Sequence, residues 1–335
     1  MTWLRKEYKK MKYVTLKGTD IKVSNPALGT DSMGEPMTEE VSREVLDSFT
    51  EAGGTLIDTA LSYNDWAPGE KSRSEKIIGR WLKDRGNRHN LVISTKGGHP
   101  PMGNMDISRL SEKEIFSDIN ESLTHLGTDY VDIYFLHRDD ERLPVAPIME
   151  TLNKLVKSGK TRSIGLSNWH PCRVKEAMDY CNAHNLAPIT SSQIQFGVAR
   201  PNIHLIDPTL SIMDKQGYEF YKNENINVFA FSAQSKGYFS KLDAGSPLSP
   251  KASERYDNPQ SRIIFEKLKE LSAKYGCTVT EAVSAVLCSN PAFVTIPILG
   301  CKKPEHVKTS IRASDIQISP ADVAKVLKLG LIVHN

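Results

Sequence analysis

Four polar residues stand at or just past the C-terminal ends of short apolar runs in this sequence: Asp58, Tyr63, Lys96 and His137. Three of these runs are typical of buried strands, at residues 55–58, 91–96 and 130–137. In parallel α/β folds, functional residues gather on the loops at the carboxyl ends of the strands. We therefore expect the four side chains to meet at one point.

The residue types suit proton transfer to a carbonyl oxygen. A tyrosine hydroxyl can donate a proton, but its ordinary pKa of ~10 is far from neutral, and a nearby lysine ammonium lowers it. An aspartate can keep that lysine charged and in place, and a histidine can orient the substrate oxygen or share in proton delivery. No serine or cysteine is paired with a base and no metal-ligand cluster is present, so we predict no metal site. Because no side chain supplies hydride, a bound cofactor has to supply it.

Several segments, in order along the chain, resemble the motifs of the aldo-keto reductase family. They are residues 53–60 (Gly-Gly-Thr-Leu-Ile-Asp-Thr-Ala) followed by Tyr63, residues 94–97 (Ser-Thr-Lys-Gly), Leu136-His137, residues 159–168 (Gly-Lys-Thr-Arg-Ser-Ile-Gly-Leu-Ser-Asn) and Gln193. The resemblance runs from about residue 13 to about residue 330. It implies that Tyr63 is the proton donor, that Asp58 and Lys96 tune it, and that His137 orients the substrate carbonyl.

Alternating strand and helix signals over 335 residues predict a (β/α)8 TIM barrel with an N-terminal β-hairpin and an extra C-terminal helix. We expect a single domain over residues 1–335, with residues 1–12 as a flexible tail. The hairpin is predicted at 13–16 and 21–23, and the barrel strands at 27–29, 55–58, 91–96, 130–137, 162–166, 192–196, 228–231 and 292–296.

N-cap signals predict where the helices begin. Thr38 precedes two glutamates, and Gly53 is the expected stop of that helix. Capping boxes, in which Ser or Thr is followed three residues later by Glu, are predicted at 72–75, 111–114 and 278–281. Further helices are predicted near 171–183, 208–224 and after Ser319, whereas residues 245–259, rich in Pro, Ser and Gly, predict a long loop.

No G-x-G-x-x-G motif is present, so a Rossmann site is not indicated. The resemblance implies instead a nicotinamide dinucleotide that lies extended across the barrel mouth. Its carboxamide is assigned to Ser167, Asn168 and Gln193, and its nicotinamide ring to Phe231. Its pyrophosphate is assigned to Ser232, Ala233, Gln234 and Lys236. The cofactor is also expected to contact the end of the first barrel strand, at Gly29, Thr30 and Asp31.

Residues 299–310 correspond by the same resemblance to the adenosine end of the cofactor. They follow the last strand and open a helix whose N-terminus favours an anion. Lys302 and Lys303 there suggest a 2′-phosphate, and hence NADP, with NAD as the alternative. The sequence departs from the family pattern at Ser310, where an asparagine often contacts the adenine, and at His306, where an arginine is common. Gly300 is also assigned to the binding of the cofactor at this end.

Two loops, residues 62–72 and 97–111, exceed the usual two to six residues and suggest a substrate role. Trp66 either packs against a substrate such as a sugar ring or plugs its loop onto the barrel rim, and His99 follows Lys96 closely. Beside His137, Arg138, Asp139 and Asp140 either bind hydroxyls of a polyol-like substrate or pair with each other at the barrel rim. A sugar-derived aldehyde or ketone is accordingly one candidate substrate.

The composition excludes several classes of partner. A net charge of +3, with 25% charged residues, indicates neither nucleic acid nor a membrane surface as a partner, and no run reaches the ~18 apolar residues of a membrane span. The five cysteines are odd in number and lack C-x-x-C spacing, and no secretory leader is evident. These features predict a cytoplasmic enzyme that acts on a small molecule; they leave its oligomeric state open.

The leading hypothesis is an NADP(H)-dependent oxidoreductase that reduces an aldehyde or ketone to an alcohol. An alternative from the same resemblance is a nicotinamide-binding protein that senses redox state with little turnover. A third hypothesis, an unrelated barrel hydrolase with paired carboxylates, is disfavoured because Asp58 is the one carboxylate among the four residues.

Overall fold

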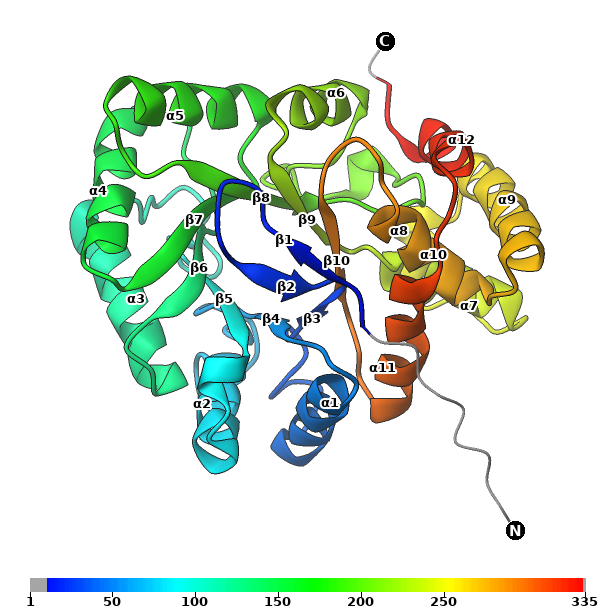
Figure 1. The fold of residues 1–335 in the computed structure, drawn as a ribbon, viewed down its shortest axis with the longest axis horizontal. Coiled ribbons are helices and arrows are strands. Elements are labelled where there is room, and N and C mark those ends of the chain that lie inside the picture. The colour runs from blue at the N-terminus through cyan, green and yellow to red at the C-terminus, as the bar shows by residue number, and fades with distance from the viewer. Residues whose placement is uncertain (1–10, 334–335) are drawn as a thin grey trace.

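Eight short parallel strands close into a barrel in the computed structural model, which describes residues 11–333 (Figure 1). The strands follow one another around the barrel in chain order, and the last pairs with the first, as in a (β/α)8 barrel. Their bounds are β3 (Ala27–Gly29), β4 (Leu56–Asp58), β5 (Val92–Gly97), β6 (Val131–Leu136), β7 (Thr161–Ser167), β8 (Ile189–Gln195), β9 (Asn227–Phe231) and β10 (Thr295–Leu299).

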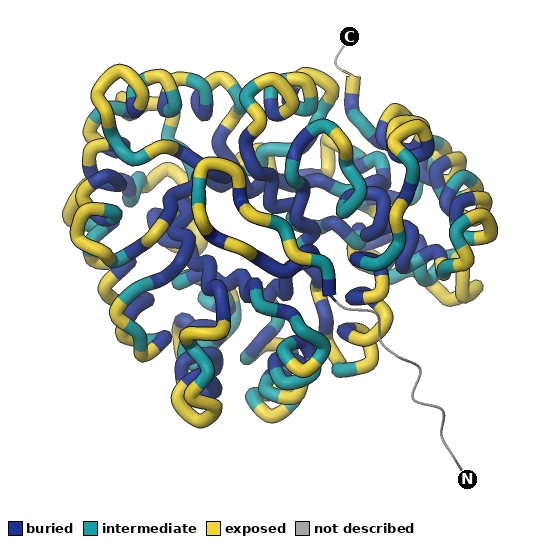
Figure 2. The backbone as a smooth tube through the Cα atoms, in the orientation of Figure 1, coloured by how far each residue is buried: buried dark blue, intermediate teal, exposed yellow. Residues whose placement is uncertain are grey.

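Helices surround the barrel, and their apolar faces pack on the outer side of the strands (Figures 1 and 2). Among the helices between residues 11 and 333, none combines the length and the hydropathy that a membrane span needs. The helices are α1 (Glu39–Glu51), α2 (Arg73–Arg85), α3 (Glu112–Leu126), α4 (Val145–Lys157), α5 (Pro171–Ala183), α6 (Lys215–Glu224), α7 (Tyr238–Asp243), α8 (Pro250–Tyr256), α9 (Pro259–Tyr275), α10 (Val279–Cys288), α11 (Pro304–Ile311) and the C-terminal α12 (Pro320–Gly330).

The N-terminal hairpin closes the end of the barrel at which the strands begin. Its antiparallel strands are β1 (Tyr13–Thr15) and β2 (Lys22–Ser24), which Figure 1 shows across the barrel opening. Leu16, Ile21 and Val23 of the hairpin belong to one buried cluster with barrel-lining residues of β4, β6, β9 and β10. Because this end is plugged, a ligand has to enter from the opposite end, where the strands terminate.

Residues 11 and 12 do not belong to a flexible tail, which we expect over residues 1–12. Residues 1–10 lie outside the described part of the chain. Met11 is buried, and the carbonyl of Lys12 accepts a hydrogen bond from the backbone N–H of Asn25. Residues 11 and 12 therefore belong to the folded chain.

Two of the three predicted capping boxes are confirmed, at Ser111 with Glu114 and at Thr278 with Glu281. The box predicted at 72–75 is wrong. The Glu75 carboxylate accepts a hydrogen bond from Thr95 Oγ1 at 2.5 Å instead of returning to the helix start. Ser72 has a left-handed backbone (φ 56°) and makes no side-chain cap.

The long loop predicted at 245–259 is also wrong, because it holds helix α8 and the start of α9. Ser249 caps α8 by accepting from the N–H of Ala252, and Asn258 caps α9 by accepting from the N–H of Ser261. A proline follows each cap at the first helical position, where its missing N–H costs nothing. The Pro- and Ser-rich composition thus marks two helix starts.

Three elements begin three or more residues away from the predicted position. Strand β8 begins at Ile189 and not at Ser192. Helix α6 begins at Lys215 and not near residue 208, because residues 211–213 are extended and exchange backbone hydrogen bonds with Gln195 at the end of β8. The last strand begins at Thr295 and not at Ala292, because the Asn290 side chain bonds to Ala292 N and Thr295 Oγ1 and holds the intervening residues in a turn.

Candidate active site

Neighbouring strands bring the four polar residues together at the open end of the barrel. Asp58 is the last residue of β4, Lys96 lies one residue before the end of β5, and His137 directly follows β6. Strand β5 pairs with both β4 and β6, so the three side chains are adjacent. Tyr63 reaches the same point from the loop that follows β4.

Lys96 is the centre of this arrangement. Its side chain is fully buried, and its ammonium donates three hydrogen bonds: to Asp58 Oδ2 at 2.7 Å, to the carbonyl of Thr59 at 2.7 Å and to the Tyr63 hydroxyl oxygen at 2.9 Å. An ammonium has three N–H donors and no acceptor, so this environment matches the charged form. Burial lowers the pKa of Lys96, and the charge of Asp58 opposes that shift.

Asp58 is held by more than the lysine. Its Oδ1 accepts from Ser94 Oγ at 2.7 Å and from Gln193 Nε2 at 2.9 Å, while Oδ2 faces Lys96. Both carboxylate oxygens are therefore satisfied inside the protein. A buried ion pair with such additional hydrogen bonds is fixed in position, which a residue that positions a proton donor requires.

The Tyr63 hydroxyl is oriented as a proton donor. Its oxygen accepts from Lys96, and its own proton has no acceptor among residues 11–333. Burial raises the pKa of Tyr63 well above its ordinary value, Asp58 and Asp31 raise it further, and Arg138 lowers it. The net shift is upward, opposite to the lowering that the residue types predict, because burial is the largest of these influences.

His137 lies edge-on to Tyr63, with ring centroids 6.0 Å apart. Its Nδ1 is 3.3 Å from Ser62 Oγ, and its backbone N–H donates to the carbonyl of Gly97. Burial lowers the pKa of His137 well below its ordinary value, and the charges of Arg138 and Lys96 act in the same direction. The imidazole is therefore neutral at physiological pH.

These two shifts predict a broad pH plateau for carbonyl reduction. The phenol of Tyr63 stays protonated above its ordinary pKa of 10.0, and His137 stays neutral below its ordinary pKa of 6.5. We expect kcat/KM for reduction to be constant between these two values. A pH–rate profile with a limb between pH 7 and 9 would contradict a protonated Tyr63 and a neutral His137.

The two long loops bring further candidate residues to the site. The His99 ring lies 4.8 Å from that of His137, and its Nδ1 is 2.6 Å from the carbonyl of Pro100. Burial lowers the pKa of His99. Trp66 contacts Tyr63 edge-on at 6.3 Å and is 55% exposed, so the interpretation that it plugs its loop onto the barrel is not supported.

Exposed apolar side chains lie on some of the loops at the open end of the barrel. Nine large apolar side chains are exposed in the described part of the chain, and six of them lie on three loops that follow strands. We call these six residues the apolar rim: Trp66 after β4; Met102, Met105 and Ile107 after β5; Ile203 and Leu205 after β8.

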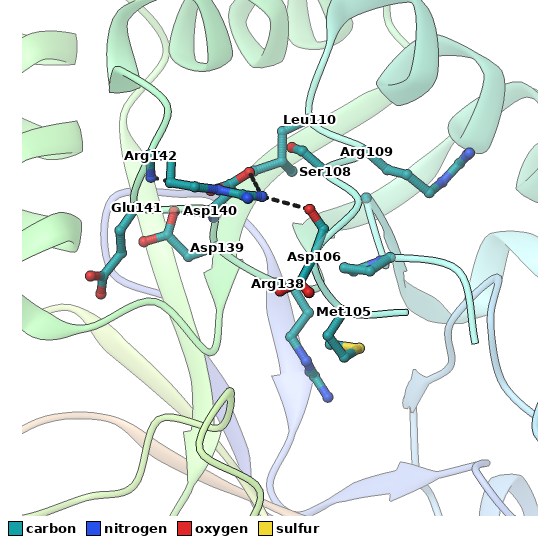
Figure 3. A pocket seen from close by; sticks show the side chains of 12 residues that line it. Met105, Asp106, Ser108, Arg109, Leu110, Arg138, Asp139, Asp140, Glu141 and Arg142 are labelled. Carbon is teal, nitrogen blue, oxygen red and sulfur yellow. Dashed lines mark hydrogen bonds and ion pairs between the residues drawn. The ribbon is translucent and has the colours of Figure 1, made fainter. Parts of the chain in front are cut away.

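The interpretation that Arg138, Asp139 and Asp140 pair with each other is wrong, because other arginines compete for the two carboxylates. Asp139 accepts from Arg173 at 3.1 Å, and Asp140 pairs with Arg142 at 2.7 Å. With the loop after β5, this segment lines a pocket of about 260 Å³ (Figure 3). The two carboxylates are thus engaged by arginines and are not free to bind substrate hydroxyls.

The three residues assigned to a carboxamide lie side by side at the ends of β7 and β8. Ser167 pairs with Gln193 in the sheet, and Asn168 follows Ser167 with a left-handed backbone (φ 59°). The Asn168 side chain bonds to His137 O, Ser167 Oγ and Ser211 N. The Gln193 side-chain amide donates an N–H to Asp58, and its Oε1 remains available as an acceptor.

The residues assigned to the end of the first barrel strand lie at the end of β3. The Thr30 hydroxyl donates to the backbone carbonyl of Asp58, and Thr30 lies between Gly29 and the exposed Asp31.

The loop after β9 is built from unusual backbone conformations. Phe231 ends the strand and is half-buried, and Ser232, Ser235 and Lys236 all have positive φ (54°, 49° and 54°). Positive φ in three residues other than glycine stores strain, which is common where a loop clasps a ligand. Ala233 between them is buried.

Gln234 joins this loop to the segment assigned to the adenosine end. Its Nε2 donates to Ser310 Oγ at 3.0 Å, and its Oε1 accepts from Gly300 N at 3.3 Å. His306 Nδ1 accepts from Lys302 N at 3.4 Å, and Lys302 and Lys303 are exposed before α11. The residues assigned to the two ends of the dinucleotide are therefore contiguous.

Lys251 and Arg255 are missing from the sequence prediction, because their segment was expected to be a loop. They lie one turn apart on α8. Burial lowers the pKa of Lys236, and the charges of Arg255, Lys251 and Lys302 lower it further, whereas Asp31 raises it. These four cations form what we call the basic cluster, and within residues 11–333 none of them pairs with a carboxylate. The i, i+4 spacing of Lys251 and Arg255 is the sequence signal that could have placed both cations on one face of a helix.

Comparison with known proteins places this geometry in context. The model of the aldo/keto reductase family matches residues 27–330. The chain is 26% identical to an aryl-alcohol dehydrogenase of Pestalotiopsis microspora over 92% of this chain and 79% of the relative. It is 26% identical to the norsolorinic acid reductase of Emericella nidulans over 89% of this chain and 73% of the relative.

Among solved structures, the chain resembles a thermostable aldo-keto reductase in complex with the inhibitor epalrestat. The TM-score is 0.71 at 24% identity, and the match covers 96% of this chain and all of the other. At this level of identity, the likeness supports the barrel fold.

Proposed function

The chain belongs to the aldo/keto reductase family, and from this premise we propose that it reduces an aldehyde or ketone to an alcohol with NADPH as the hydride donor and Tyr63 as the proton donor. The observation that carries the proposal is the buried contact of Lys96 with both Asp58 and the Tyr63 hydroxyl oxygen, together with the lack of an acceptor for the tyrosine proton among residues 11–333.

The described residues fit a phosphorylated nicotinamide dinucleotide. The basic cluster of Lys236, Lys251, Arg255 and Lys302 is a set of mutually repelling cations, and such a set is stabilised by an anion. Gln193 Oε1 offers an acceptor for a carboxamide N–H, and half-buried Phe231 offers an aromatic face. When bound, NADPH supplies the hydride.

Tyr63 donates its proton to the carbonyl oxygen as that oxygen gains negative charge. Lys96 donates to the Tyr63 oxygen and stabilises the phenolate that remains, while Asp58 keeps the ammonium charged and in place. Ser62 Oγ lies near Nδ1 of neutral His137. If Ser62 donates to Nδ1, the ring proton sits on Nε2, where it can donate to the same carbonyl oxygen.

The apolar rim favours an aromatic carbonyl compound over a sugar. Trp66 presents an exposed ring next to Tyr63, and the carboxylates of Asp139 and Asp140, which would otherwise be available to sugar hydroxyls, are taken by arginines. The names of two relatives, an aryl-alcohol dehydrogenase and a norsolorinic acid reductase, agree with an aromatic substrate.

The proposal is tested by following NADPH absorbance with a panel of aromatic aldehydes, aryl ketones and aldose sugars. We expect turnover with aromatic aldehydes at a kcat/KM higher than that for any sugar. Tight NADPH binding with no turnover of any compound would support the redox-sensing alternative instead.

Lys302→Ala is expected to weaken NADPH binding by about tenfold or more and to leave NADH binding nearly unchanged, because a charge-assisted hydrogen bond to a phosphate contributes roughly 1.5 to 3 kcal/mol. Titration of each cofactor by fluorescence measures both affinities. Lys308→Ala, which removes an exposed lysine within α11, is the matched control and should change neither. An equal loss for NADPH and NADH would show that Lys302 does not read the 2′-phosphate.

A further inference from the structure

Arg138 differs from the other charged residues of the segment after β6. Asp139 and Asp140 are paired with Arg173 and Arg142, respectively. Arg138 has no ion pair with any carboxylate of residues 11–333. Figure 3 shows its guanidinium pointing away from Asp139, Asp140 and Arg142.

The guanidinium is also poorly satisfied by hydrogen bonds. One Nη donates to the carbonyl of His137 at 3.0 Å, and the buried Nε has no partner within the described part of the chain. Burial lowers the pKa of Arg138, and the charge of Asp207 opposes this shift. The Asp207 carboxylate itself accepts from Thr209 N and Thr209 Oγ1, at 2.9 and 2.7 Å, and not from Arg138.

Arg138 acts electrostatically on the catalytic centre. It follows His137 directly, and its charge adds to the lowering of the pKa of His137 and of His99 that burial causes. For Tyr63, its charge opposes the larger rise in pKa that burial causes. It also lines the 260 Å³ pocket together with Met105 of the apolar rim. A cation with unused donors therefore lies next to the catalytic His137 and lines a pocket beside it.

We propose that Arg138 binds an anionic group, a carboxylate or a phosphate, on the carbonyl substrate, and so makes the enzyme selective for acidic aromatic aldehydes and ketones. The inference rests on the proposed reductase function. A guanidinium presents its N–H groups in a planar fork that fits a carboxylate or phosphate with two parallel hydrogen bonds. An incoming anion supplies the counter-charge and the acceptors that Arg138 lacks in the protein alone.

Matched aldehydes test this selectivity. The probes are 4-carboxybenzaldehyde, 4-formylphenyl phosphate and the neutral methyl 4-formylbenzoate, each reduced by the NADPH-loaded enzyme. The wild-type protein is expected to prefer at least one anionic probe over the ester by a factor on the order of 10 to 100 in kcat/KM. Which anionic probe is favoured tells the carboxylate from the phosphate as the group recognised.

Arg138→Gln is expected to abolish this preference through a higher KM for the anionic probes. The change in kcat/KM for the ester should be much smaller, because burial is the main influence on the pKa of His137 and of Tyr63. Arg138→Lys should retain part of the preference, because it keeps the charge but loses the fork. Arg142→Gln is the matched control: it removes an arginine of the same segment that already pairs with Asp140, and it should leave the preference intact.

The outcomes separate this inference from the proposed function. Two outcomes overturn the role of Arg138 and leave the reductase function standing. In the first, the wild-type enzyme reduces the ester with the same kcat/KM as both anions. In the second, the Arg138→Gln variant loses activity on all three probes equally. If no probe is reduced, the reductase function fails. Calorimetric titration of the NADP⁺-loaded protein with terephthalate then still decides: binding that Arg138→Gln weakens at least tenfold supports the anion site, and its absence overturns it.

Discussion

Tyr63→Phe is expected to lower kcat for carbonyl reduction by a factor on the order of 10² to 10⁴, which is the usual contribution of a positioned general acid. The substitution removes the hydroxyl group whose oxygen accepts a hydrogen bond from Lys96. NADPH affinity should be little changed, since the residues proposed to bind the cofactor lie on other loops. Steady-state kinetics together with a cofactor titration measures both quantities.

Tyr134→Phe is the matched control for that variant. Tyr134 is a fully buried tyrosine of β6 whose hydroxyl has no hydrogen-bond partner in the described part of the chain. Its loss should leave kcat intact. Retention of most activity by Tyr63→Phe would remove Tyr63 from the role of proton donor.

Lys96→Met is expected to cost both activity and stability. The side chains of Lys96 and Asp58 are 0% and 1% exposed, and removing one partner of a buried ion pair leaves an uncompensated charge, at a cost of about 3 to 5 kcal/mol. The phenolate of Tyr63 also loses the ammonium that stabilises it, so kcat falls in a variant that is still folded. Denaturant unfolding and kinetics at a permissive temperature measure the two effects.

The control for stability is Lys154→Met, which breaks the exposed pair with Glu112 and should cost less than about 1 kcal/mol. The double variant Lys96→Met with Asp58→Asn should be less destabilised than the sum of the two single variants, since it leaves no unpaired charge. Purely additive losses would contradict a direct coupling between Lys96 and Asp58.

The convergence of the four residues can be predicted from the sequence, because this convergence depends only on where the strands end. Asp58, Lys96 and His137 each close an apolar run, and parallel strands in a barrel bring their ends together. The contacts of Asp58 with Ser94 and Gln193 are not predictable in this way. They depend on which strands are neighbours and on the direction in which each side chain points.

Local signals succeed where the partners are close in sequence and fail where a distant partner competes. Ser111 and Glu114 form their capping box, but Glu75 is drawn to Thr95 across the fold. The prolines and N-caps of residues 245–259 can mark either turns or helix starts, so the sequence does not predict α8 and its two cations. The protonation state of Tyr63 likewise depends on burial, which residue types alone do not report.

The origin of the hydrogen added to the substrate tests the central claim most directly. With NADPH deuterated at both C4 positions and an aromatic aldehyde as substrate, mass spectrometry of the alcohol should find one deuterium, bound to the carbinol carbon. Tyr63→Phe should form the same labelled alcohol, but more slowly than the wild-type protein. An alcohol without deuterium, or bound NADPH that reduces no aldehyde of the panel, would contradict hydride transfer from the nicotinamide to a carbonyl carbon.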